Sequence, residues 1–207
     1  MAITDNQKYV LVPDDTIEIK ERGIIHKLYR IRAIRDLPKS KVRAGDLGGY
    51  VESMDNLSHL DDAWVYDGAK VYGDARVRHD ARISGNARVY GNAIILDRAR
   101  VYGNARVHGH ARIFGDARIY ENANVYGEAR IFERGEVYGN ARVFSRGWVF
   151  CRAQVYGSSW VYGNAFITDL VNVRGKSRIC GEEWYEGSTV IEDDQVRVFT
   201  TASCDPY

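Results

Sequence analysis

His79 and Asp97 are the two side chains in this sequence best suited to proton transfer. They lie eighteen residues apart, so a chain that repeats its path every eighteen residues brings them together. A carboxylate beside an imidazole can orient the ring and support its action as a general base. The two residues are therefore the candidate catalytic pair. We prefer a structural interpretation of the same pair, in which it belongs to a ladder of charged side chains.

The ladder extends through the chain at the same interval. One column is His79, Asp97, Gly115, Glu133, Cys151 and Asp169, and the column beside it is Asp80, Arg98, Asp116, Arg134, Arg152 and Leu170. Neighbouring acids and arginines can stabilise a corner of the fold by ion pairing, without catalysis. Cys151 would be a nucleophile only if Arg134 or Arg152 stabilised its thiolate, and we expect a structural role for it.

The histidines do not predict a metal site. His108 and His110 occupy other positions on the eighteen-residue path than His79 does, so the three imidazoles cannot converge within one chain. Zinc sites need three or four converging side chains. We expect no metal and no other cofactor.

Tyrosines and arginines recur in register and predict a binding surface. Both residue types often dominate the binding energy of interfaces, and together they can also hold phosphates and stack on bases. The net charge of +1 gives no overall argument for nucleic acid, so a protein is the preferred macromolecular partner. The alternative is that the charges only keep an exposed strand surface soluble. The expected partner-binding residues are Tyr102, Tyr120, Tyr138, Arg82, Arg100, Arg118, Tyr90, Tyr126 and Arg106.

A separate set of large apolar residues predicts self-association. Phe and Leu have no hydroxyl group for water, so a column of them on a monomer would be an exposed apolar patch. We expect a dimer or a trimer that buries this patch, and the alternative is that the chain ends fold over it. The expected interface residues are Ile94, Leu96, Phe114, Phe132, Trp148, Phe150 and Phe166.

A six-residue repeat positions all of these side chains. From Val65 to Arg178 the sequence runs through nineteen hexapeptides without an insertion. The first position is Val or Ile in all nineteen, and the fifth is Ala in fourteen. β-Branched residues favour strands that face a core, and Gly at the third position tolerates the positive φ of a turn. Each hexapeptide therefore predicts a short strand and a corner, and three of them make one coil of a solenoid.

Every third hexapeptide stacks on the same side of the predicted solenoid. Face one begins at Val65, face two at Val71 and face three at Val77. The tyrosines of the repeat fall on faces one and two, and most of its phenylalanines fall on face three. The ends differ in composition, because residues 1–50 predict a hairpin and a turn whereas the last residues are acidic. We expect a single domain with an N-terminal cap at 1–50, a β-helix at 51–184 and an acidic cap at 185–207.

Several segments resemble the YdcK-like branch of hexapeptide-repeat proteins. They are Arg30-Ile-Arg-Ala-Ile-Arg-Asp, Val42-Arg-Ala-Gly-Asp-Leu-Gly-Gly-Tyr-Val-Glu, Asn56-Leu-Ser and Trp64-Val-Tyr, besides the repeat itself. The resemblance implies an all-β fold, a left-handed parallel β-helix of triangular coils, and the number of hexapeptides predicts about six to seven of these coils. It also implies acyltransferase activity as one possibility, with the catalytic histidine at a subunit boundary. Many similar proteins occur in phages and prophages.

The expected function is that of a non-catalytic, oligomeric interaction protein, which in a phage setting would block a host component. The alternative is an acyltransferase that uses acetyl-CoA or another acyl-CoA, with His79 as the base and Asp97 orienting it. Against catalysis, the repeat has no loop excursion that could build an acceptor pocket. The start of the sequence lacks the basic and apolar segments of a signal peptide, and no apolar run is long enough for a membrane span. We therefore expect a cytoplasmic protein, in a bacterial or phage-infected cell, that does not bind membranes.

Overall fold

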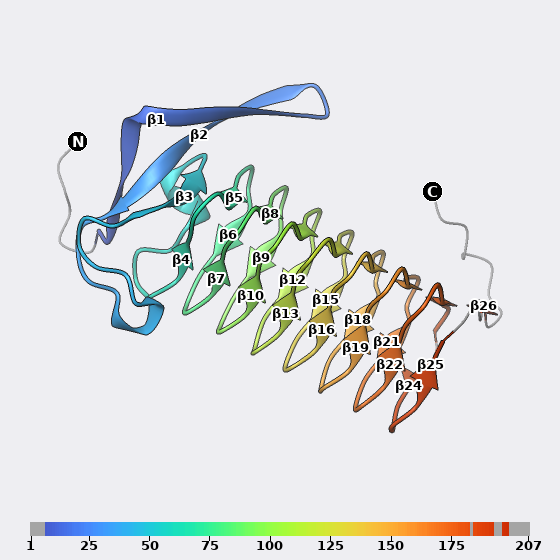
Figure 1. Ribbon diagram of the computed structural model, residues 1–207. Helices are drawn as coiled ribbons and strands as arrows, with labels where there is room; N and C mark the ends of the chain where they lie inside the picture. Colours follow the sequence, from blue (N-terminus) through green and yellow to red (C-terminus); the bar gives the residue numbers. More distant parts are fainter. Residues whose placement is uncertain (1–6, 183, 193–195, 199–207) are drawn as a thin grey trace.

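The repeat folds into an all-β parallel solenoid with almost no helix (Figure 1). The computed structural model describes residues 7–182, 184–192 and 196–198. Successive partners in each sheet are eighteen residues apart, as in Arg82↔Arg100 and Arg100↔Arg118. The predicted coil length is therefore confirmed. Two short 3₁₀ helices, η1 (Pro38–Ser40) and η2 (Met54–Asn56), precede the regular coils.

Three parallel sheets form the faces of the solenoid. Face one contains β4 (Trp64–Val65), β7 (Arg82–Ile83), β10 (Arg100–Val101), β13 (Arg118–Ile119), β16 (Glu136–Val137), β19 (Gln154–Val155), β22 (Asn172–Val173) and β25 (Val190–Ile191). Face three contains β6 (Arg76–Val77), β9 (Ile94–Ile95), β12 (Arg112–Ile113), β15 (Arg130–Ile131), β18 (Trp148–Val149), β21 (Phe166–Ile167) and β24 (Trp184–Tyr185).

Face two is the largest sheet, because the N-terminal strands join it. Its solenoid strands are β5 (Lys70–Val71), β8 (Arg88–Val89), β11 (Arg106–Val107), β14 (Asn124–Val125), β17 (Arg142–Val143), β20 (Trp160–Val161), β23 (Arg178–Cys180) and β26 (Val196–Val198). β3 (Leu47–Val51) pairs in parallel with β5, and it also pairs antiparallel with β2 (Ile24–Ala33). β1 (Tyr9–Glu21) completes the sheet.

The solenoid has about eight coils, so the prediction of six to seven was too low. The sequence pattern fades after Ile179, yet the chain keeps its path. Phe166 pairs with Trp184, and Asn172 pairs with Val190, both at the eighteen-residue interval. Backbone hydrogen bonds to the preceding coil extend the sheets even where the side-chain pattern is lost.

The core is formed by the first positions of the hexapeptides, as predicted, together with the fifth positions. Val101 and Ile119 have no exposed surface, and the same holds for Ala105 and Ala117. Full burial of a Val or Ile side chain contributes about 1.5–3 kcal/mol, so the column of β-branched residues supplies the main driving force for coiling. Alanine at the corner keeps the interior narrow enough to close.

The N-terminal region forms an antiparallel hairpin of β1 and β2, and β1 has a bulge between Val12 and Thr16. It extends over the start of the solenoid next to β5 and β8 (Figure 1). Lys8 and Tyr9 anchor its base in the interior. The Nζ atom of Lys8 donates hydrogen bonds to the carbonyl oxygens of Asp61 (2.6 Å) and Ala63 (2.7 Å). Burial lowers the pKa of Lys8 to about 8.

Candidate functional site

The structure brings His79 and Asp97 together at the corner that leads from face three to face one. Their Nδ1 and Oδ1 atoms lie 2.9 Å apart, and the backbone N–H of Gly115 donates to Oδ2 of Asp97 (3.0 Å). Both residues adopt a positive φ of 57°. Their side chains are 53% and 47% exposed, so the imidazole faces solvent. The geometry suits an oriented imidazole, but it also suits a structural corner ladder.

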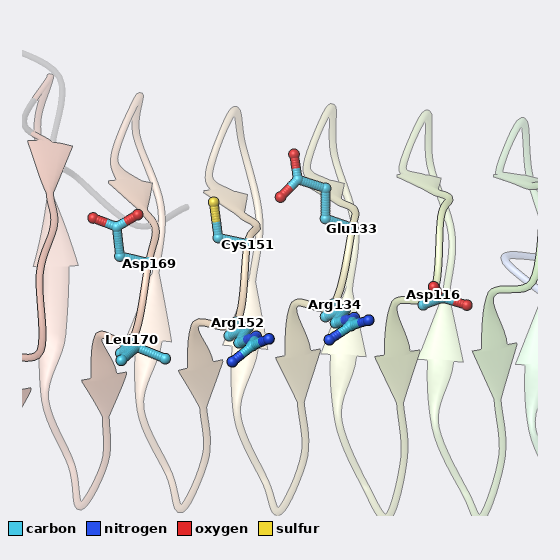
Figure 2. Close-up of a pocket in the computed structure, with 7 residues that line it drawn as sticks. All are labelled: Asp116, Glu133, Arg134, Cys151, Arg152, Asp169 and Leu170. Carbon is cyan, nitrogen blue, oxygen red and sulfur yellow. The ribbon is translucent and has the colours of Figure 1, made fainter.

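Further along this corner lies an open groove of about 650 Å³ (Figure 2). Figure 2 shows Glu133, Cys151 and Asp169 in one row, with Arg134 and Arg152 in a second row beside it. The Sγ atom of Cys151 accepts a hydrogen bond from the hydroxyl group of Thr168 (3.2 Å). The groove thus combines acids and arginines in adjacent rows. One pair of the ladder, Arg98 and Asp116, is in contact at 2.7 Å.

Face one presents a ladder of four stacked tyrosines. Ring centroids lie 4.9 Å apart for Tyr102 and Tyr120, 4.7 Å for Tyr120 and Tyr138, and 4.8 Å for Tyr138 and Tyr156. The planes of these rings are within 4° of parallel. The rings are partly exposed because they project from the outer side of the sheet. Burial against neighbouring rings raises the pKa of Tyr120, and the carboxylate of Glu136 adds to this effect.

An arginine column borders this ladder. Arg82, Arg100 and Arg118 occupy equivalent places on β7, β10 and β13. Arg118 lies 3.4 Å from Glu136, and Arg82 donates a hydrogen bond to the carbonyl oxygen of Lys39. Arg100 makes no ion pair with any residue that the structure describes. The predicted Tyr and Arg residues of face one are therefore gathered on one rigid surface.

Face two holds a longer aromatic ladder, but the hairpin covers its beginning. The stacked rings are Tyr72, Tyr90, His108, Tyr126, Phe144 and Tyr162. His26 of the hairpin contacts the ring of Tyr72 (5.0 Å), which is 1% exposed. Charges at Glu21 and Arg22, in the hairpin turn, act on Tyr90 and His108. Tyr90 and Arg106 therefore lie beside the hairpin. Tyr126 lies further along the ladder, where the charges of Glu21 and Arg22 have no effect on its ring.

Face three carries the large apolar residues together, as a partly exposed patch. The rings of Phe114 and Phe132 stack at 4.9 Å, and those of Phe132 and Phe150 at 4.7 Å. Trp184 extends the patch, since it stacks on Phe166 at 4.7 Å and is 60% exposed. The side chains of Ile94, Leu96 and Trp148 are also partly exposed on this face. The hairpin lies along face two, so among the described residues it is not the cover of this patch.

Metal binding finds no support in the described residues, where no three His, Cys, Asp or Glu side chains form a group that could hold an ion. His108 is stacked between Tyr90 and Tyr126, and burial lowers its pKa. His79 lies on another edge of the solenoid. No helix in the described part of the chain is long and apolar enough to span a membrane.

One set of residues was not recognised in the sequence. A groove of about 570 Å³ lies at the N-terminal end of face one, lined by Tyr66, Ser84 and Tyr102 together with the three arginines. Ser40 and Lys41 from the N-terminal region also line it. The available signal was the interruption of the tyrosine column by Ser84, at a position where the following coils carry tyrosine.

Comparison with known families gives one match, and it falls within the solenoid. The model of the YdcK β-solenoid repeat matches residues 81–97, the segment that contains β7, β8 and β9. No curated protein matches the chain. The match agrees with the stacked parallel strands and with the hexapeptide pattern. The chain is thus a β-solenoid repeat protein that resembles the YdcK family.

Proposed function

We propose that this protein is a non-catalytic interaction scaffold with a left-handed solenoid, whose face one binds a macromolecular partner. The observation that carries the proposal is the ladder of Tyr102, Tyr120, Tyr138 and Tyr156, stacked at 4.7–4.9 Å on strands in register. A stiff sheet has already ordered these side chains, so binding loses little conformational entropy. Tyr and Arg are also frequent hot-spot residues. A protein is preferred to nucleic acid as the partner.

Self-association through face three is the second part of this proposal. The stacked phenylalanines and Trp184 form an apolar strip that water solvates poorly. A dimer or trimer that joins these strips would leave face one open. The partner would then meet the Tyr and Arg surface and not the Phe surface.

The experiment is affinity capture of lysate proteins on the wild-type protein, compared with a Tyr120→Ala/Tyr138→Ala variant. The expected result is that the variant loses the captured protein while its circular dichroism spectrum is unchanged. Tyr29→Ala, a tyrosine of the hairpin, is the matched control and is expected to retain capture. If the wild-type protein and the double variant capture the partner equally, face one is not the binding surface and the proposal is wrong.

The second candidate function is acyl transfer from acetyl-CoA or another acyl-CoA. The 2.9 Å contact between His79 and Asp97 favours it, because the carboxylate would hold the imidazole as a general base. His79→Ala then removes activity by roughly a hundredfold or more, as for a lost general base. Under the scaffold proposal the same variant keeps partner capture. The acyltransferase function therefore predicts that His79→Ala inactivates the protein, whereas the scaffold function predicts that the variant works like the wild type.

A further inference from the structure

The tyrosine column of face one has one missing ring. In-register pairing of β4, β7 and β10 places Tyr66, Ser84 and Tyr102 at equivalent positions in three successive coils. Backbone hydrogen bonds confirm the register, since Tyr66 N donates to Ile83 O (2.8 Å) and Ser84 N to Val101 O (2.9 Å). Ser84 has no ring, so the ladder is interrupted between two tyrosines.

The interruption has the size of one aromatic ring. Each coil rises by about 4.8 Å, the spacing between paired strands, so Tyr66 and Tyr102 are separated by two such steps. Rings in the intact part of the ladder stack at 4.7–4.9 Å. One planar ring placed over Ser84 would therefore lie one coil step from a tyrosine position on each side. The groove of about 570 Å³ at this place has room for such a ring and more.

Both sides of the gap are held in position. The hydroxyl group of Tyr66 donates a hydrogen bond to the carbonyl oxygen of Ser40 (2.7 Å). Tyr102 is supported by its stacking on Tyr120, with an angle of 1° between the ring planes. Ser84 lines the groove, and its hydroxyl group can act as a donor and an acceptor. A ligand ring would meet a site that is already ordered, which favours affinity.

The surroundings of the gap select an anion. Arg82, Arg100 and Arg118 line the groove with Lys41, and the acidic residue in its lining is Asp67. Arg82 and Ser84 point to the same side of one extended segment, about 6.6 Å apart. This separation leaves room for a sugar between a ring at Ser84 and phosphates over the arginines. Arg100 is exposed and has no ion-pair partner among the described residues, so its guanidinium is available.

We propose that this groove binds a nucleoside phosphate, with the base stacked between Tyr66 and Tyr102 and the phosphates on Arg82, Arg100 and Arg118. Stacking of bases on aromatic rings together with arginine contacts is a sequence-tolerant mode of nucleotide binding. The groove does not include Tyr120 or Tyr138, the residues that the capture experiment changes. Failure of one proposal is therefore distinguishable from failure of the other.

The test is isothermal titration calorimetry of the wild-type protein with ADP, adenosine and ribose 5-phosphate. ADP supplies ring and phosphates, whereas each of the other two probes supplies only one of them. We expect ADP to bind with a dissociation constant on the order of tens of micromolar, and the two partial probes about tenfold or more weaker. Coenzyme A, which contains an adenosine phosphate, is expected to compete with ADP in wild-type protein and equally in the His79→Ala variant.

Ser84→Tyr is the deciding variant, because its ring would complete the protein's own ladder and fill the gap. We expect it to fold like the wild type and to bind ADP at least tenfold more weakly. Arg78→Tyr adds the same ring at an equivalent position on face three and is expected to bind ADP normally. Arg100→Ala is expected to lose about tenfold in ADP affinity, and the exposed Arg76→Ala to lose none. The proposal is overturned if ADP shows no saturation at 1 mM, if ribose 5-phosphate binds as well as ADP, or if Ser84→Tyr retains the wild-type affinity.

Discussion

At the corner between faces three and one, residues other than glycine adopt a positive φ, a backbone conformation that glycine adopts at most other corners. His79, Asp97, Glu133, Cys151 and Asp169 all have φ between 54° and 57°. This left-handed region costs a residue with a Cβ atom roughly 1–2 kcal/mol. Five residues on this one edge adopt the conformation, and the edge also carries the ion pairs and hydrogen bonds of the charged ladder. We infer that His79, Asp97, Cys151 and Asp169 recover part of that cost through their side-chain hydrogen bonds.

Ser145 tests the cost at a corner of face two, where it has φ 55° and its side chain makes no hydrogen bond with any residue that the structure describes. Ser145→Gly is expected to raise the free energy of unfolding by about 1 kcal/mol, because glycine adopts this conformation without strain. Urea denaturation measures the change. Ser158→Gly is the control at a corner position without positive φ, where glycine is expected to be neutral or destabilising. Equal effects at the two serines would contradict the argument.

His108 makes stability depend on pH in the acid range. Burial between Tyr90 and Tyr126 lowers its pKa below the usual 6.5, and Arg22 adds to the effect. Below pH 6.5 His108 binds a proton in the unfolded chain but not yet in the folded protein. The free energy of unfolding therefore falls as the pH decreases. His108→Tyr continues the ladder without this titration. We expect a shallower decrease in melting temperature between pH 6.5 and 5 for the variant, with His59 supplying the remaining slope.

At the scale of elements, the hairpin and the solenoid are joined by a buried lysine. Lys8 has no exposed surface, and its two hydrogen bonds reach the backbone just before β4. The hairpin thereby stays next to face two, where His26 contacts Tyr72 and its Nδ1 atom lies 2.9 Å from a carboxylate oxygen of Glu52. This placement covers the start of the face-two ladder and leaves the ladder of face one accessible.

Lys8→Met is expected to lower stability by about 1–3 kcal/mol at pH 7, because two buried carbonyl groups lose their donor. The variant also changes the alkaline range. The pKa of Lys8 is about 8 in the folded protein and 10.5 when unfolded, so the unfolded chain holds the extra proton between these values. Stability from this group therefore increases as the pH rises from about 8 to 10.5. The difference between wild-type and variant unfolding free energies should grow over this window. A constant difference would contradict the assigned titration.

At the scale of the whole molecule, the three faces of the solenoid differ in the residues on their outer surfaces. Face one carries the partly exposed tyrosines and the arginines, the hairpin lies along face two, and face three carries the phenylalanine strip. The division follows from the eighteen-residue period, because each face repeats its own outward residue types in every coil. One surface can thus be used for self-association while another remains free for a ligand or a partner.

Phe114→Asp/Phe132→Asp tests this division. Placing two carboxylates in an apolar contact costs several kcal/mol. We therefore expect the variant to be monomeric at concentrations where the wild-type protein is expected to form a dimer or a trimer. Light scattering at tens of micromolar measures the mass. Tyr138→Asp/Tyr156→Asp introduces the same charges on face one and is expected to leave the oligomer intact. A wild-type protein that is monomeric at this concentration would contradict the assignment of face three.

The sequence by itself determined the coil and the character of its faces. Burial of Val101 and Ile119 follows from a period set by local sterics and by the need of β-branched side chains for a core. The sorting of Tyr and Phe onto different faces follows from the same period. The approach of His79 to Asp97 also follows, because residues eighteen apart must meet in successive coils.

Only the tertiary structure decided what lies across these faces. The sequence pattern ended near Ile179, while backbone pairing carried the coils on through β24 and β25. Nothing in the repeat fixed the side on which the hairpin packs, because that depends on contacts such as Lys8 with Asp61, more than fifty residues apart. The ring-sized gap at Ser84 likewise needs Tyr66, held by Ser40 from outside the repeat. A short repeat specifies local strands and corners, whereas docking of distant segments depends on side chains that no period connects.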